Sequence, residues 1–316
     1  MRLRIFFVLV LVFTLPLLAV SARADILGAA DTYAVLATTQ VTNGATNLAD
    51  TVITGNMGDT SCTGFVLGTG CTLGFGTVSG TVNSGNAAWI TALAASNAAY
   101  TSLQNTPSTS NFTGSCLGSG VGCINNLAPG VYSSTLSATL LNGALTLAGG
   151  SNSAPIWIFQ MAAGFTTASN SSVLVTGTGA ASAGVYFEVG TQATLGDNTA
   201  FQGNILAGTS VVFDPGAQIT CGRAFTDTAA GTAVTFAGNN PATTTGTPNK
   251  VSDTCAQSTS GFNNGTIVTL PGGGTGVGPG TPVPEPGTLA LLSSGLLAMV
   301  FLAFRKARVS SPSLSC

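Results

Sequence analysis

The sequence predicts an all-β protein in which short strands coil into a solenoid and one long α-helix lies alongside. Three observations support this. A pattern of apolar residues recurs at intervals near twenty residues in the second half of the chain. Turns rich in Gly, Asn and Asp separate the copies. A single segment has the composition of a long helix.

The expected helix covers Asn86–Thr106. This segment is rich in Ala, contains neither Gly nor Pro, and begins at a residue (Ser84 or Asn86) that can cap the first turn. Pro107 ends it. The larger apolar side chains near one face, which we expect to pack on the strands, are Trp89, Leu93, Tyr100 and Leu103.

The strand repeat aligns without gaps. Gly190–Leu195, Gly208–Phe213 and Gly231–Phe236 match at every apolar position, and Ala162–Thr167 is a looser copy. The copies start 28, 18 and 23 residues apart. Further strands are expected near Val173, Phe201 and Ile219, and again at Tyr186, Ile205 and Phe225. A β-sandwich or barrel is the alternative, but neither explains the recurring register.

The first 24 residues are typical of a secretory signal peptide. Arg2 and Arg4 precede an apolar run, and Ala22-Arg23-Ala24 provides small residues at a cleavage site. An uncleaved membrane anchor is the alternative. Cleavage would start the mature domain, 25–270, at Asp25.

The C-terminal segment predicts a second sorting signal. A Gly/Pro linker, 271–282, leads to Pro284-Glu285-Pro286, then to an apolar stretch of membrane-spanning character at 288–304 and a basic cluster that ends at Arg308. This order, over 283–308, resembles the PEP-type signal that exosortases process, although the tail 309–316 extends beyond the usual end. A plain tail anchor is the alternative. Both place the domain outside the inner membrane, at the cell envelope or in the extracellular matrix.

Cysteine usage agrees with export, because disulfides persist in oxidising compartments. Cys62 and Cys71 flank one Gly-rich loop, and Cys116 and Cys123 flank another, so short-range pairing is expected for both. Cys221 and Cys255 are the remaining pair of the domain, and Cys316 is left over in the tail.

Composition excludes several functions. The chain has no histidine, so a Ser-His-Asp triad or a His-ligated metal cannot form. Between Asp25 and Leu270, two basic residues face nine acidic ones, which gives this stretch a net charge of −7 and disfavours nucleic acid as a partner. We expect no enzyme activity, no cofactor and no metal. A weak calcium site at the turns of Asp197 and Asp214 is the one metal alternative.

Six short segments together resemble the ice-binding-protein-like family over roughly residues 26–240. They are Ile26–Ala37, Thr54–Gly58, Pro129–Tyr132, Ile156–Gln160, Gly203–Ala207 and Gly222–Ala224. The resemblance implies a discontinuous right-handed β-solenoid with a long helix packed alongside. It also implies ice as the partner, bound in an antifreeze, recrystallisation-inhibiting or ice-adhesion role by a monomer.

The resemblance implies an ice-binding face, and strand alternation puts its residues on the outward columns of the repeat. The family's Thr-Ala/Gly-x-Thr/Asn motif matches Thr232–Thr235 fully and the other copies in part. The expected ice-binding residues are Gly164, Thr166, Thr191, Gln192, Thr194, Thr209, Ser210, Val212, Thr232, Ala233 and Thr235. Gln192 and Val212 depart from the motif and predict moderate activity. Threonines that merely favour strands on a solvated face are the alternative.

Two other functions stay open from sequence alone. A non-catalytic exopolysaccharide-binding module would need exposed aromatic residues, yet we expect burial of Trp89, Trp157, Phe159, Phe201 and Phe213. A structural surface-layer role is the other, and nothing in the sequence opposes it.

Overall fold

The computed structural model describes residues 25–45, 50–65, 71–227, 232–238, 247–269 and 275–278. The expected signal peptide, sorting signal and tail lie outside these residues. Part of the expected linker does not: Thr275–Gly278 forms strand β26, antiparallel to β25 (Thr266–Thr269). Backbone groups of β25 thereby gain partners from this part of the linker.

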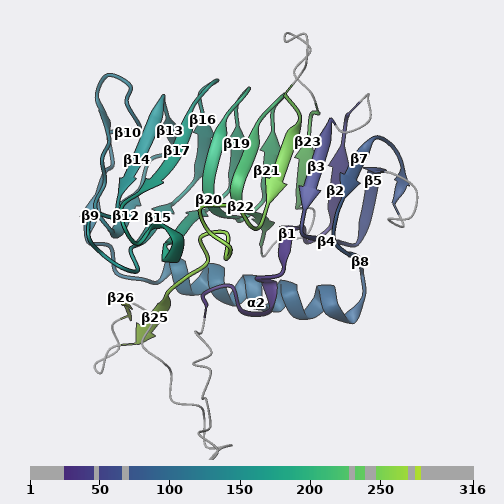
Figure 1. The fold of residues 1–316 in the computed structure, drawn as a ribbon, viewed down its shortest axis with the longest axis horizontal. Coiled ribbons are helices and arrows are strands. Elements are labelled where there is room, and N and C mark those ends of the chain that lie inside the picture. Colours follow the sequence, from purple (N-terminus) through teal and green to yellow (C-terminus); the bar gives the residue numbers. More distant parts are fainter. Residues whose placement is uncertain are drawn as a thin grey trace, which may run out of the picture. The chain divides into compact units, whose positions relative to one another are not determined.

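Within the described residues, 24 strands join one parallel sheet, and one long helix lies beneath it (Figure 1). The chain advances in coils: β15, β16 and β17 pair in parallel with β18, β19 and β20 of the next coil. Equivalent strands of successive coils therefore form three rows, which we call the front row, the back row and the helix-side row.

The front row, in spatial order, is β10 (Cys116–Leu117), β13 (Ala138–Leu141), β16 (Gly164–Thr167), β19 (Gln192–Leu195), β21 (Ser210–Phe213), β23 (Ala233–Phe236), β2 (Gln40–Asn43) and β5 (Ser61–Phe65). The back row contains β14 (Ala144–Ala148), β17 (Ser172–Thr176), the first parts of β20 (Ala200–Ala207) and β22 (Gln218–Thr226), β24 (Asn249–Ser252), β3 (Thr51–Thr54) and β7 (Gly76–Val78).

The helix-side row contains β9 (Ser110–Asn111), β12 (Gly130–Ser134), β15 (Ile156–Met161), β18 (Gly184–Val189), the second parts of β20 and β22, β1 (Tyr33–Leu36), β4 (Asn56–Asp59) and β8 (Val82–Ser84). The short elements are β6 (Thr72–Leu73), β11 (Cys123–Ile124) and the 3-10 helices η1 (Gly28–Ala30) and η2 (Ala180–Ser182).

The coils do not stack in chain order. The N-terminal strands β1, β2 and β3 pair with β22, β23 and β24, so the first coils of the chain extend the stack beyond the last ones. Helix α2 (Ala87–Gln104) then carries the chain along the stack from β8 to β9 at the other end (Figure 1). Eighteen residues give a helix about 27 Å long.

Helix α2 is slightly shorter than expected, and its buried face differs. The Asn86 side chain accepts a hydrogen bond from the Trp89 backbone N–H at 2.9 Å, which fixes the start. The buried residues are Ala92, Ser96, Ala99, Tyr100 and Leu103, whereas Trp89 and Leu93 are half-buried. Small side chains at Ala92, Ser96 and Ala99 let the helix lie close against Leu36, Leu206 and Phe225.

Inside the coils, aromatic side chains from neighbouring strands stack on one another. The ring centroids of Phe159 and Phe187 are 4.5 Å apart, and those of Phe187 and Phe201 are 4.7 Å apart. Phe213 and Phe236 repeat the contact at 4.6 Å. Each fully buried ring contributes about 2 kcal/mol of hydrophobic stabilisation. Of the aromatic residues expected inside, Trp157, Phe159, Phe201 and Phe213 are fully buried.

Two expected strand pairs are instead continuous strands. Phe201 and Ile205 both lie in β20, and Ile219 and Phe225 both lie in β22. The chain turns the corner within each strand at a glycine, because Gly203 and Gly222 have φ values of 131° and 138°. A Cβ at Gly222 would lie 1.9 Å from the Gly203 carbonyl oxygen, so no other residue fits there.

The structure confirms the two disulfides that short spacing predicts, with Cα–Cα distances of 4.8 Å for Cys62–Cys71 and 4.3 Å for Cys116–Cys123. The remaining pair of the domain, Cys221 and Cys255, is also joined, at a Cα–Cα distance of 5.4 Å. Each is worth about 2–4 kcal/mol through its restriction of the unfolded chain. The Cys221–Cys255 bond ties β22 to the segment that follows β24.

Candidate functional site

The candidate site is the outward surface of the front row. The pairing register of β19, β21 and β23 is the one that the repeat predicts: Thr194 lies beside Val212, and Val212 beside Thr235. Thr166 of β16 lies beside Thr194 on the other side. The front row therefore brings the four aligned copies into adjacent positions.

Side chains alternate in and out along each of these strands. Ala193, Val211 and Val234 are fully buried, and so are Leu195, Phe213 and Phe236. The residues between them form two outward ranks. The first rank holds Ala138, Gly164, Gln192, Ser210, Ala233, Gln40 and Ser61, and the second holds Leu140, Thr166, Thr194, Val212, Thr235, Thr42 and Thr63. All fourteen are exposed or half-buried.

Six members of these ranks come from strands that the repeat did not reveal. Ala138 and Leu140 belong to β13, and the other four belong to β2 and β5. Strand β2 follows β23 in the row and contributes Gln40 and Thr42, and β5 then adds Ser61 and Thr63. The signal was present in the sequence, because Thr39–Thr42 and Thr60–Thr63 both read Thr-x-apolar-Thr. The pairing of β2 with β23, however, joins residues far apart in the sequence, so no pattern of neighbouring residues predicts it.

Thr232 is a correction to the expected site. It was expected among the exposed ice-binding residues, as Thr191 and Thr209 were, and those two are exposed, but Thr232 is only 2% exposed. Its hydroxyl accepts a hydrogen bond from the Thr226 hydroxyl at 3.3 Å, and its carbonyl oxygen accepts one from the Thr39 backbone N–H at 3.1 Å. The added coil of β2 covers this position, so Thr232 supports the row from inside.

Hydrogen bonds within the ranks limit the motion of the threonine side chains. The Thr42 hydroxyl donates to the Thr235 hydroxyl across the strands at 3.1 Å. The Gln192 amide donates to the Thr194 hydroxyl at 2.8 Å, so the long side chain lies along the surface over its neighbour. Because β-branching already restricts χ1, little side-chain freedom remains to be lost when this surface binds a ligand.

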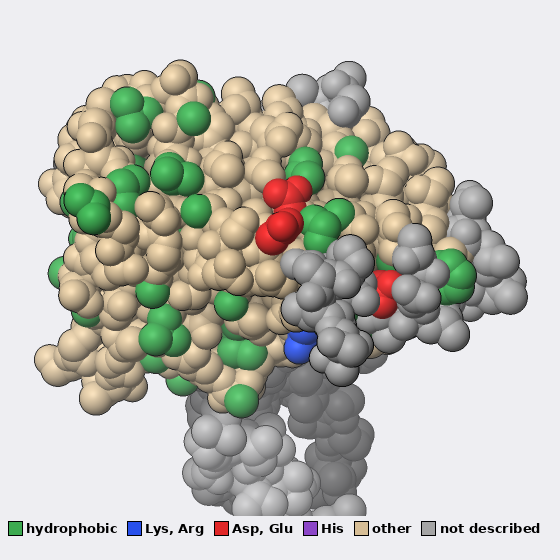
Figure 2. Space-filling model, turned by 90° about the horizontal axis from the view of Figure 1, so that it is seen from above, with side chains coloured by type: hydrophobic (Ala, Val, Ile, Leu, Met, Phe, Trp, Pro, Cys, Tyr) green, Lys and Arg blue, Asp and Glu red, His purple; other side chains and the backbone are tan. Residues whose placement is uncertain are grey.

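Neither rank contains a charged residue. Seen from above, the described surface is mostly uncharged, with acidic side chains near the centre and again to the right, a basic side chain near the lower edge, and scattered hydrophobic side chains (Figure 2). Asp197 and Asp214 lie near each other at equivalent turns, and burial and this neighbour raise the pKa of Asp214. Among the described residues, no three Cys, Asp or Glu side chains gather where they could hold a metal ion.

The most perturbed acids lie away from the front row, beneath helix α2. Burial raises the pKa of Glu188 to about 7, against the lowering effect of a hydrogen bond from Tyr100. Burial likewise raises the pKa of Asp227 to about 7, and Ser96 Oγ donates to its Oδ1 at 2.8 Å. One carboxylate oxygen of each is buried with no hydrogen-bond partner. The hydrogen bonds of Glu188 with Tyr100 and of Asp227 with Ser96 join helix α2 to the sheet.

The expected sorting residues Pro284, Glu285 and Pro286, and the apolar stretch 288–304, lie outside the described residues. Within the part of the chain that is described, no helix has the length and apolarity needed to span a membrane.

Comparisons with known proteins agree on one family. A family model described as ice-binding-like matches residues 35–242, and a PEP-CTERM protein-sorting motif matches residues 282–308. An ice-binding protein of Nostoc sp. (strain HG1) is 33% identical over 292 residues, which cover 91% of this chain and 89% of that protein. Ice-binding protein 1 of Shewanella frigidimarina (strain NCIMB 400) is 32% identical over 99 residues, 31% of this chain and 11% of its own.

Solved structures show the same arrangement. The crystal structure of an ice-binding protein from the Antarctic ascomycete Antarctomyces psychrotrophicus has a TM-score of 0.57 and 30% identity, and the match covers 73% of this chain and 98% of that one. An ice-binding protein from an Arctic yeast, at 22% identity and a TM-score of 0.57, shares the fold over 72% of this chain and 95% of its own.

Proposed function

Because this chain belongs to the ice-binding-like family, we propose that it is an exported protein that binds ice through the outward ranks of the front row. The observation that carries the proposal is the pairing register, which aligns Thr166, Thr194, Thr235, Thr42 and Thr63 in one rank interrupted only by Val212. The ice-binding residues are the expected set without Thr232, extended by Gln40, Thr42, Ser61 and Thr63.

The geometry of the ranks suits a crystalline ligand. Neighbouring strands repeat every 4.7–4.9 Å or so, and alternate residues along a strand repeat about every 6.6 Å, which produces a regular two-dimensional array. Threonine methyl groups order the adjacent water, and the hydroxyls hold that water in place. The absence of charge matters, because a strongly hydrated ion would disturb an ordered water layer.

We propose further that the coiled sheet is a right-handed β-solenoid, triangular in section, that acts as a monomer without enzyme activity. The matched sorting motif supports export, processing by an exosortase and association with the cell envelope or matrix. A signal peptide at 1–24, a domain at 25–270 and a membrane-spanning segment at 288–304 complete this organisation.

Thermal hysteresis and recrystallisation inhibition of the purified protein test the proposal. We expect shaped ice crystals and a measurable gap between melting and freezing, of moderate size because Gln192 and Val212 interrupt the ranks. A protein that leaves ice growth unchanged at every concentration would refute ice binding while leaving the family assignment intact.

A further inference from the structure

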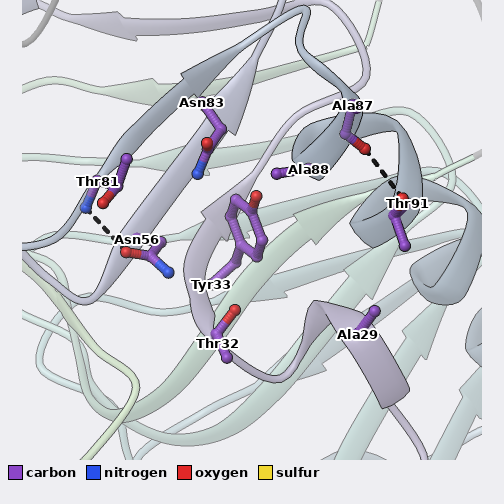
Figure 3. Close-up of a pocket in the computed structure, with 9 residues that line it drawn as sticks. All are labelled: Ala29, Thr32, Tyr33, Asn56, Thr81, Asn83, Ala87, Ala88 and Thr91. Atoms are coloured by element: carbon purple, nitrogen blue, oxygen red, sulfur yellow. Dashed lines mark hydrogen bonds between the residues drawn. The ribbon is translucent and has the colours of Figure 1, made fainter.

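A hollow of about 500 Å³ opens where helix α2 begins, away from the front row (Figure 3). Its walls come from separate parts of the chain: Ala29 of η1, Thr32 and Tyr33 before and within β1, Asn56 of β4, and Asn83 of β8. The first turn of α2 closes one side with Ala88. Cavities of a few hundred Å³ are the size of small-molecule sites.

Two side-chain amides in the hollow are oriented by the protein itself. The Asn56 Oδ1 accepts from the Thr81 backbone N–H at 2.8 Å, and the Asn83 Oδ1 accepts from the Asn86 Nδ2 at 2.9 Å. Their own amide nitrogens have no partner among the described residues and point into the space beside Tyr33 (Figure 3). Asn83 is only 8% exposed, so its amide is mostly shielded from bulk solvent, and it lines the hollow.

Hydroxyl groups surround these donors. Thr32 and Thr81 are exposed at the rim, and the Tyr33 hydroxyl lies between the amides and Ala88 (Figure 3). Burial raises the pKa of Tyr33, so its hydroxyl stays neutral. Ala29 and Ala88 supply small apolar patches between the polar groups.

The lining selects a chemical class of ligand. None of the lining residues is charged, so an ion would lose its hydration without gaining a counter-charge. An entirely apolar molecule would leave the two amide donors unsatisfied. A ring that carries several hydroxyl groups can bond to the amides, and its C–H surface can contact the alanines.

We propose that this hollow binds one neutral sugar residue, either free or at the end of a glycan chain. Asn56 and Asn83 donate hydrogen bonds to ring hydroxyls, Thr32 and Thr81 exchange them at the rim, and the alanines contact the C–H face. The site is separate from the front row, so the protein can hold a carbohydrate and ice at the same time.

Saturation-transfer NMR on the purified full-length chain, in a detergent without a sugar headgroup, tests the proposal with glucose, galactose, mannose and N-acetylglucosamine, and with the charged sugar glucuronate for comparison. At least one neutral sugar should bind with a Kd on the order of 1 mM. An oligosaccharide that ends in the same sugar is tested next. Saturation transfer to its terminal ring shows that the end of a glycan chain enters the hollow. If only glucuronate binds, or if no sugar does, the proposal is wrong.

Ala88→Trp fills the hollow from an exposed helix position, and Ala98→Trp is the matched control, exposed on the same helix but outside the lining. Ala88→Trp should weaken sugar binding at least about tenfold, while Ala98→Trp and the front-row variant Thr235→Lys should bind as the wild type does. Equal binding by both tryptophan variants would overturn the site. Because Thr235→Lys alters only the front row, failure of the ice proposal leaves this test unaffected.

Discussion

Two threonines that are close in sequence have different roles in the front row: one faces the ligand and the other supports the row from inside. Thr232 and Thr235 are three residues apart in one strand segment, yet Thr232 is buried and Thr235 lies in the outward rank. The sequence motif includes both threonines as binding residues. In the structure, the coil of β2 covers Thr232 and leaves Thr235 on the surface.

Thr232→Val should therefore leave thermal hysteresis unchanged while lowering stability by about 1 kcal/mol, because the buried hydroxyl loses its bond with Thr226. Denaturant unfolding and a thermal hysteresis assay on the same sample measure the two effects. Loss of ice activity from this variant, at unchanged stability, would place Thr232 on the binding surface after all.

At the scale of elements, Arg223 joins three distant segments. Its guanidinium is 2% exposed and contacts the Asp31 carboxylate at 2.6 Å, the Asn204 side chain at 3.1 Å and the Ser260 carbonyl oxygen at 3.0 Å. Asn263 also donates to Asp31 at 2.7 Å. The start of the domain, strand β22 and the segment after β24 are therefore held at one point.

Arg223→Met should destabilise the domain by about 3–5 kcal/mol, because it leaves the Asp31 carboxylate and several carbonyl groups without their partner. Lys250→Met is the control, since Lys250 is half-buried and forms no ion pair among the described residues. Chemical unfolding of both variants decides the matter. Similar losses of stability would contradict the role assigned to Arg223.

Helix docking should make stability depend on pH. Glu188 and Asp227 have pKa values raised to about 7 by burial, and helix α2 has no charged residue to compensate them. In the unfolded chain both titrate near 4. A raised folded pKa means that the native state binds more protons, so its stabilisation is complete below about pH 4 and is lost as the pH rises through about 7.

Denaturant unfolding between about pH 4 and pH 8 should show stability falling by a few kcal/mol, at about 1.4 kcal/mol per pKa unit. Glu188→Gln with Asp227→Asn should flatten this profile, and the turn variant Asp197→Asn should not. A profile that keeps its slope in the double variant would mean that other groups cause it.

Features that depend on residues close together in the sequence were predictable, whereas features that depend on residues far apart in the sequence were not. The register of β16, β19, β21 and β23 was predictable because alternation along a strand and the spacing of copies are local properties. The single strands β20 and β22 were not predicted, because a glycine turns the chain without a recognisable turn sequence. The place of β2 and β5 depends on contacts between chain segments almost two hundred residues apart, as in the Thr42–Thr235 bond.

At the scale of the whole molecule, the described residues all belong to one compact unit. Deletion of Val283–Cys316 should therefore release the protein from the cell envelope and leave the melting temperature of the domain unchanged. Cell fractionation and thermal unfolding check the two halves of this prediction. A truncated protein that stays in the membrane fraction, or that melts earlier, would contradict it.

One face of the molecule, the front row, is proposed to bind ice. The most direct measurement compares thermal hysteresis of Thr235→Lys with that of Thr146→Lys, a half-buried outward position on β14 in the back row. Both variants introduce the same charge on a parallel strand of the same coiled sheet. Thr235→Lys should abolish ice activity and Thr146→Lys should retain it at unchanged stability. Full activity in Thr235→Lys, or equal loss in both variants, would contradict the claim.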